Sequence, residues 1–174
     1  MSKFLRAVSL LLALGVAAPA VADDRPAAPS FNLRTLDGDR VKLSDFEGKV
    51  LLMSFWATWC APCKQELPIL QDLLNRYGDQ GLAVVAVNID DPKTIAEVRR
   101  YVKLKKFTFP VPLDSDSKVL SSYNPRVALP FLQIIDRQGR RVANHTGFSS
   151  GAEKALEKEV LALLAEKPTE KAAP

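Results

Sequence analysis

Apolar residues occur along the chain in two patterns that alternate. Residues 50–55 and residues 82–89 are nearly continuous apolar runs, which are typical of strands covered on both faces. Between them, Leu67, Leu70 and Leu74 recur at the three- and four-residue spacing of a helix. A chain that alternates strands and helices in this way predicts an α/β fold around a parallel sheet.

Shorter elements flank this centre. Residues 31–36 and 40–43 alternate between apolar and polar on either side of Asp37-Gly38, a pair typical of tight turns, and therefore predict an N-terminal β-hairpin. The elements expected after the second strand are a helix to about residue 105, an extended segment at 109–113, a short helix at 116–123, strands at 131–135 and 140–146, and a final helix. The last two strands add an antiparallel edge to the sheet.

Length and composition fit a single globular domain. The chain has 174 residues, of which 47% are hydrophobic and 25% are charged. We expect a signal peptide over residues 1–22, a linker over residues 23–29, one folded domain over residues 30–166 and a flexible tail over residues 167–174.

The first 22 residues have the three parts of a secretory signal. Lys3 and Arg6 form a positive start, residues 7–18 are apolar, and residues 20–22 form a small-x-small cleavage site. These features predict export to the periplasm with a cleaved leader. The alternative is an uncleaved segment that anchors the protein in the membrane.

The overall charge excludes one class of partner. The formal net charge is +4, and two of the cations lie in the predicted leader, so the rest of the chain is close to neutral. It has no basic stripe with interleaved aromatic residues, and we therefore expect no nucleic-acid partner. We also expect a monomer without a cofactor or a bound metal.

The two cysteines, Cys60 and Cys63, lie three residues apart where the first central strand passes into a helix. At a helix N-terminus, unpaired N–H groups and the helix dipole stabilise a thiolate. We expect a reversible disulfide, in which the more exposed Cys60 attacks a partner disulfide and Cys63 resolves the mixed disulfide. Pro62 stiffens the pair, and Trp56 and Trp59 offer an apolar docking face.

Other uses of two cysteines stay open. A zinc site needs four ligands, and His145 is the only histidine. A purely structural bridge of this span would constrain little of the unfolded chain. A copper-binding module, an interaction module without turnover, and a peroxidase of the peroxiredoxin type are further alternatives, although neither cysteine has the Thr/Pro/Arg setting that the peroxidase needs.

The segment Trp59-Cys60-Ala61-Pro62-Cys63, followed by Glu66 and Pro68, resembles the WCxPCxxExP signature of the thioredoxin superfamily. Residues 43–50 and the extra hairpin resemble its exported TlpA/ResA-like branch, and the resemblance covers roughly residues 30–165. It implies a thioredoxin fold, with a central mixed sheet flanked by helices. It also implies a reductant of protein disulfides that is supplied by a membrane thiol electron donor, with cytochrome c maturation as one use.

The resemblance also implies roles for single residues. Pro130 matches the cis-proline of the superfamily, and the backbone of Leu129 is then expected to pair with the substrate strand. Ser54 occupies the position of a buried aspartate that moves the proton of the second cysteine. Asp91, with Asp90 beside it, matches an alternative proton acceptor of the exported branch, or it simply caps the next helix.

Two further residues have plain interpretations. Glu66 is expected to be an exposed partner of the helix dipole, with a functional acid as the alternative. His145 is expected to be a surface or structural residue, with a catalytic residue as the alternative. Phe131 and the long approach at residues 123–128 depart from the superfamily pattern and alter the partner groove. The resemblance therefore does not identify the partner.

Overall fold

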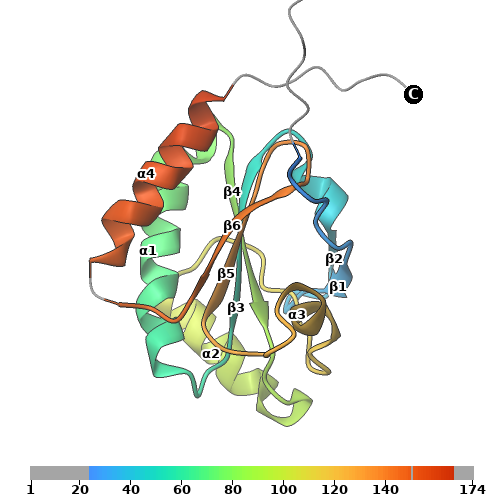
Figure 1. Ribbon diagram of the computed structural model, residues 1–174. Helices are drawn as coiled ribbons and strands as arrows, with labels where there is room; N and C mark the ends of the chain where they lie inside the picture. The colour runs from blue at the N-terminus through green and yellow to red at the C-terminus, as the bar shows by residue number, and fades with distance from the viewer. Residues whose placement is uncertain (1–23, 150, 167–174) are drawn as a thin grey trace, which may run out of the picture.

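The computed structural model describes residues 24–149 and 151–166 (Figure 1). The β-strands and longer helices follow the predicted order. They are β1 (Asn32–Arg34), β2 (Arg40–Lys42), β3 (Val50–Trp56), α1 (Ala61–Tyr77), β4 (Leu82–Asn88), α2 (Ile95–Lys105), α3 (Lys118–Tyr123), β5 (Phe131–Ile135), β6 (Arg141–Thr146) and α4 (Ala152–Ala165). Short 3-10 turns lie at Leu43–Phe46, Gly78–Gln80 and Pro92–Thr94.

The main sheet has four strands in the order β4-β3-β5-β6. β3 and β4 are parallel, whereas β5 runs antiparallel to β3, and β6 antiparallel to β5. β1 and β2 form the predicted hairpin as a separate antiparallel pair. The extended segment at residues 109–113 lies beside β4, because the N–H groups of Ala86 and Asn88 donate to the carbonyls of Pro110 and Pro112. The mixed α/β architecture is therefore as predicted.

Each face of the sheet buries its own core. Along β3, Leu52 and Trp56 belong to the layer beneath α1 and α4, whereas Met53 and Phe55 belong to the layer under the hairpin and α3. This alternation follows from the two-residue repeat of a strand, and Val50 to Trp56 are all buried because both faces are covered. The cysteines lie in the α1 layer.

Residues 24–29, expected to be a linker, are attached to the domain. The Ala28 N–H donates to the carbonyl of Gly139, the Arg141 N–H donates to the carbonyl of Pro26, and Arg25 pairs with Asp136. The pattern of Pro and Ala did not reveal these contacts, because they are made with the distant β5–β6 turn. The predicted signal peptide and tail lie outside the described residues. Within the described ranges, no helix has the length and apolar character needed to cross a membrane.

Candidate functional site

Cys60 and Cys63 form a disulfide at the start of α1, with their Cα atoms 5.3 Å apart. Cys60 is the N-cap residue, and its sulfur accepts a 3.2 Å hydrogen bond from the Cys63 N–H. Pro62 lies in the first turn, where a missing N–H costs nothing. Both cysteines are buried, Cys63 completely and Cys60 with 5% of its surface exposed, so Cys60 is the more accessible of the two.

The peptide bond between Leu129 and Pro130 is cis, as the resemblance predicted. It immediately precedes β5, and the first residue of that strand, Phe131, is the cross-strand partner of Phe55 in β3. β3 ends one residue later and leads into the dithiol loop. The cis bond therefore lies at the same end of the sheet as the cysteines.

The two tryptophans near the dithiol have opposite environments. Trp59 is 69% exposed directly before Cys60. Trp56 is fully buried, with its indole N–H donating to the carbonyl of Ala86 and its ring 5.6 Å from the ring of Tyr101. The predicted docking face therefore contains Trp59 alone. Trp56 is excluded because it is the last residue of a strand that is covered on both faces.

Asp90 fixes the loop in front of the dithiol. Its carboxylate accepts hydrogen bonds from the Thr58 N–H at 2.7 Å, from the Thr58 hydroxyl at 2.6 Å, and from the Asn88 side-chain amide at 2.7 Å. Asp90 is 1% exposed. A buried carboxylate with three donors holds the loop in one conformation, two residues before Cys60.

Glu66 is buried, and the expectation of an exposed dipole partner is wrong. It is 3% exposed, and its carboxyl accepts a 2.6 Å hydrogen bond from the Ser54 hydroxyl. Burial raises the pKa of Glu66 to about 7, although the Ser54 hydroxyl and the charge of His145 counteract part of that rise. The signal was present in the sequence, because Cys63, Glu66 and Leu67 fall on one face of a helix.

The Glu66 carboxyl has a route to solvent. A hollow of about 540 Å³ beneath α4 is lined in part by Glu66, His145 and Leu156. At this hollow, His145 lies 2.9 Å from a carboxylate oxygen of Glu159 in α4. Glu66 is therefore an acid with a pKa near neutrality and with access to water, on the second cysteine's helix face.

Asp91 has the geometry of a cap. Its side chain is exposed and accepts a hydrogen bond from the Lys93 N–H at the start of the 3-10 turn before α2. Its neighbour Asp90 is the buried carboxylate that faces the dithiol loop. Within residues 24–149 and 151–166, no group of three or more His, Cys, Asp or Glu side chains is arranged to hold a metal ion.

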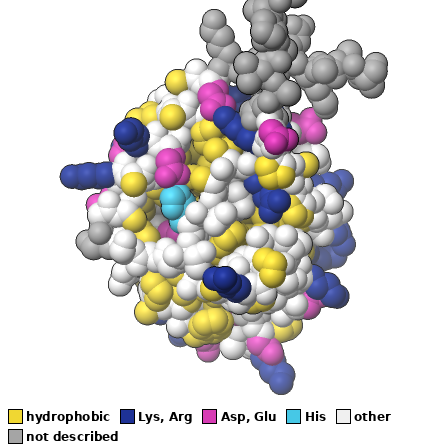
Figure 2. All heavy atoms as spheres, in the orientation of Figure 1, with side chains coloured by type: hydrophobic (Ala, Val, Ile, Leu, Met, Phe, Trp, Pro, Cys, Tyr) yellow, Lys and Arg dark blue, Asp and Glu magenta, His cyan; other side chains and the backbone are white. Residues whose placement is uncertain are grey.

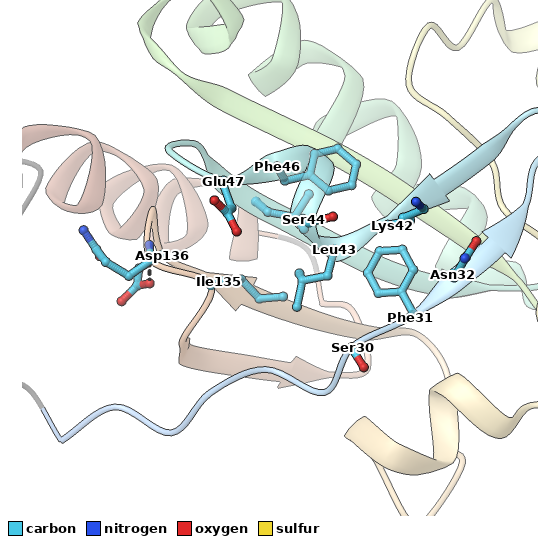
Figure 3. Close-up of a pocket in the computed structure, with 13 residues that line it drawn as sticks. Ser30, Phe31, Asn32, Lys42, Leu43, Ser44, Phe46, Glu47, Ile135 and Asp136 are labelled. Atoms are coloured by element: carbon cyan, nitrogen blue, oxygen red, sulfur yellow. Dashed lines mark hydrogen bonds between the residues drawn. The ribbon is translucent and has the colours of Figure 1, made fainter. Parts of the chain in front are cut away.

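A second hollow, of about 520 Å³, lies on the opposite face of the sheet (Figure 3). Its apolar lining comes mainly from Phe31, Leu43 and Ile135, below the turn that follows the hairpin. Asp136 lies at its edge, and its carboxylate is already paired with Arg140. The hollow contains no thiol, so the reactive chemistry belongs to the dithiol end.

The comparisons with known proteins agree with this geometry. A family model described as the AhpC/TSA family matches residues 25–142. The chain is 36% identical over 132 residues to the thiol-disulfide oxidoreductase ResA of Geobacillus kaustophilus, covering 75% of this chain and 74% of that protein. It is 40% identical over 121 residues to the thioredoxin-like protein YneN of Bacillus subtilis, covering 69% of each.

Solved structures give the same picture. A crystal structure from Chlorobium tepidum, described as a thiol:disulfide interchange protein DsbE, superimposes with a TM-score of 0.75 at 34% sequence identity. The match covers 82% of this chain and 98% of that one. The match therefore extends over most of this chain and nearly all of that structure.

Proposed function

The chain belongs to the AhpC/TSA family within the thioredoxin superfamily, and we propose that this thiol–disulfide oxidoreductase works as an exported reductant of protein disulfides. The observation that carries the proposal is the Cys60–Cys63 disulfide at the N-terminus of α1, in which Cys63 is fully buried and Cys60 is the more accessible residue. Such a pair can pass between dithiol and disulfide without rearranging the fold.

The reaction takes two exchanges. The Cys60 thiolate attacks one sulfur of the partner disulfide, so that a Cys60–partner disulfide forms and the other partner sulfur leaves as a thiolate. The Cys63 thiol then loses its proton and attacks the Cys60 sulfur. The Cys60–Cys63 disulfide forms, and the second partner sulfur leaves and takes up a proton. The partner gains two electrons, and the protein loses two.

We propose that Glu66 accepts the proton that the Cys63 thiol loses. The helix spacing of three residues puts both side chains on one face of α1, and a carboxyl with a pKa of about 7 can accept and return a proton at neutral pH. Asp91 is a weaker candidate for this role, because its carboxylate is exposed and caps the turn that leads into α2.

The partner is positioned by residues around Cys60. Trp59 supplies apolar area beside Cys60, and Pro62 keeps the dipeptide between the cysteines rigid. The backbone of Leu129, next to Pro130, pairs with the strand that carries the partner disulfide, a case of β-strand addition. These roles are proposals that rest on the common position of the four residues at one end of the sheet.

Export and the electron source complete the proposal. The leader-like residues 1–22 support secretion to the periplasm, where an unprotected dithiol is oxidised. A reductant in that compartment therefore needs a membrane thiol donor that returns the Cys60–Cys63 pair to the dithiol. Apocytochrome c is a fitting substrate class, because its cysteines must be reduced before haem attachment.

The reduction potential tests the direction. Equilibration of the purified protein in graded thiol buffers, read by thiol labelling and mass, gives the potential of the Cys60–Cys63 couple. We expect a value near or below that of thioredoxin, about −270 mV. A value near about −120 mV would make the protein a donor of disulfides instead. The absence of a reversible couple would exclude the proposed function altogether.

The substrate class needs a separate probe. A synthetic peptide that carries an oxidised CxxCH segment serves this purpose, with the same peptide in which His is replaced by Ala as its control. We expect the reduced protein to reduce both peptides, and to reduce the CxxCH peptide faster. Equal rates for the two peptides would mean that the protein is a general disulfide reductant, and apocytochrome c would no longer be supported as its substrate class.

A further inference from the structure

A hollow of about 390 Å³ opens beside the dithiol, on the side of α2. Residues from the loop before Cys60, from the start of α1 and from one face of α2 line it: Thr58, Lys64, Glu97, Arg100, Tyr101 and Leu104. Thr58 lies two residues before Cys60, and Lys64 directly follows Cys63. The hollow therefore opens between α2 and the two segments that flank the cysteines, and neither cysteine lines it.

The walls of the hollow are held together by contacts. The Tyr101 ring lies 5.6 Å from the buried Trp56 ring, and its hydroxyl donates to the carbonyl of Lys64 over 3.4 Å. Thr58, on the loop side, is fixed by two hydrogen bonds to Asp90. Tyr101 thus joins α2 to the end of β3 and to α1, while Asp90, after β4, fixes the loop that leads into the dithiol.

The rim of the hollow exposes an apolar side chain. Leu104 is 74% exposed on α2. It is not part of the face of α2 that packs against the core, which buries Val98. Together with Trp59, it belongs to the few large hydrophobic side chains that the described domain leaves in water. A single exposed apolar side chain is common on protein surfaces, so Leu104 matters here because it lines a hollow together with two cations.

The same surface carries an excess of positive charge. Two cations, Lys64 and Arg100, and one acid, Glu97, line the hollow. α2 carries five cations within residues 99–106, of which Arg99, Lys103 and Lys106 line a separate hollow nearer to the hairpin. Arg99 is paired with Asp37, whereas Arg100 and Lys103 form no ion pair with another described residue. Figure 2 shows hydrophobic and charged side chains intermixed at the lower end of the molecule, where α2 and the start of α1 lie in Figure 1.

We propose that the α2 surface docks an acidic segment of a protein that exchanges electrons with the dithiol. The α2 surface consists of Lys64, Arg100 and Leu104, which line the hollow, and of Lys103, which lies three residues after Arg100 on α2. The segment places an apolar side chain against Leu104 and carboxylates against the cations. The inference rests on the proposed function. The proposal specifies that the partner segment is acidic. It also locates the contact on the α2 side of the cysteines, away from the Leu129–Pro130 loop.

Charge complementarity and shape favour a protein segment over other occupants. Unpaired cations near a reactive group attract an acidic partner over long range and raise its association rate. A protein segment can insert a side chain into the hollow, whereas the flat surface of an anionic membrane has no side chain to insert. Binding to anionic lipid is therefore the competing outcome of the experiment.

The experiment compares two peptide disulfides of identical length that differ only in carrying Asp or Lys around a Leu-containing disulfide loop. The rate of oxidation of the reduced protein is measured with each peptide, relative to the neutral hydroxyethyl disulfide, at low and high salt. We expect the acidic peptide to react roughly tenfold faster than the basic one at low salt, with the difference lost at high salt. Equal relative rates would overturn the proposal.

Matched charge reversals locate the effect. Arg100→Glu with Lys103→Glu should abolish or invert the preference for the acidic peptide. Lys154→Glu with Lys158→Glu makes the same change in charge on two exposed lysines of α4 and should leave the preference intact. If both pairs of substitutions have the same effect, the preference comes from net charge alone, and the α2 surface is not a docking site.

Binding to the α2 surface can also be measured without disulfide exchange. The oxidised protein is titrated with a fluorescent acidic peptide in which both Cys are replaced by Ala, and the anisotropy is followed. Binding that Leu104→Ser and the α2 charge reversal weaken supports the proposal even if the redox function fails. No peptide binding, combined with salt-dependent sedimentation on phosphatidylglycerol vesicles that the reversal removes, would assign the surface to lipid instead.

Discussion

The hydroxyl of Ser54 in β3 donates a 2.6 Å hydrogen bond to the carboxyl of Glu66 in α1. This bond joins the strand that leads into the dithiol to the helix that follows it. The strand position, which holds an aspartate in thioredoxin, has no acid here, and the helix supplies the buried carboxyl instead. The proton acceptor that we propose for Cys63 therefore comes from α1, the helix that carries Cys63, and not from β3.

Replacing each cysteine separates the two exchanges. Cys63→Ser should still attack a partner disulfide and should accumulate the mixed disulfide, because nothing then attacks the Cys60 sulfur. Cys60→Ser should form no mixed disulfide, since Cys63 is fully buried. Mass spectrometry of the quenched reaction shows the adducts, and an adduct at Cys63 in the Cys60→Ser variant would contradict the assignment.

Glu66→Gln tests the proton acceptor. The substitution keeps the shape of the side chain and a hydrogen bond to Ser54, but it removes the titrating group. We expect release of the reduced partner to slow about 100-fold near pH 7, whereas the first attack by Cys60 changes little. Rapid-quench kinetics distinguish the two steps. An unchanged release rate would remove Glu66 from the proton transfer.

The raised pKa of Glu66 also makes stability depend on pH. Below its unfolded value of 4.5, the carboxyl is protonated in both states and burial carries no charge penalty. As pH rises from about 4.5 to about 7, only the unfolded state loses the proton, so the folded state is progressively destabilised. Above about pH 7, the full penalty, on the order of 3 kcal/mol, is present.

The Glu66→Gln variant lacks this penalty and serves as the reference. Urea unfolding of the oxidised proteins at pH 5 and pH 8 should show a larger loss of stability for the natural chain than for the variant. The variant should be the more stable of the two at pH 8. Parallel changes in the two proteins would mean that the buried carboxyl does not titrate as inferred.

The neighbouring acids Asp90 and Asp91 form a natural control pair. Asp90→Asn loses the charge that receives both hydrogen bonds of Thr58 and should destabilise the fold by about 1–3 kcal/mol. Asp91→Asn keeps a capping side chain at an exposed position and should cost a few tenths of a kcal/mol at most. Denaturant unfolding measures both free energies.

The same pair tests the proton acceptor suggested by the family pattern. Asp91→Asn should leave the release step at the rate of the natural chain, because its side chain is turned towards the Lys93 N–H. A slowed release in the Asp91→Asn variant, with release in Glu66→Gln unaffected, would restore Asp91 to the mechanism and exclude Glu66.

The sequence by itself determined the parts that depend on local pattern. The apolar runs predicted β3 and β4, helical spacing predicted α1, and the position of Cys60 and Cys63 at a strand-to-helix junction predicted a redox pair. Such features are encoded in a few consecutive residues. The repeat of apolar residues indicates which secondary structure a segment adopts, and packing of that apolar face against the rest of the fold stabilises it.

The tertiary structure decided which polar side chains are buried. Glu66 looked like a surface acid in the first turns of a helix, and it is buried because β5, β6 and α4 close over that face of α1. After β4, two neighbouring acids have opposite environments, because Asp90 is buried and Asp91 is exposed. Burial, and with it the pKa of an acid, is set by elements distant in the chain, so the local pattern does not specify it.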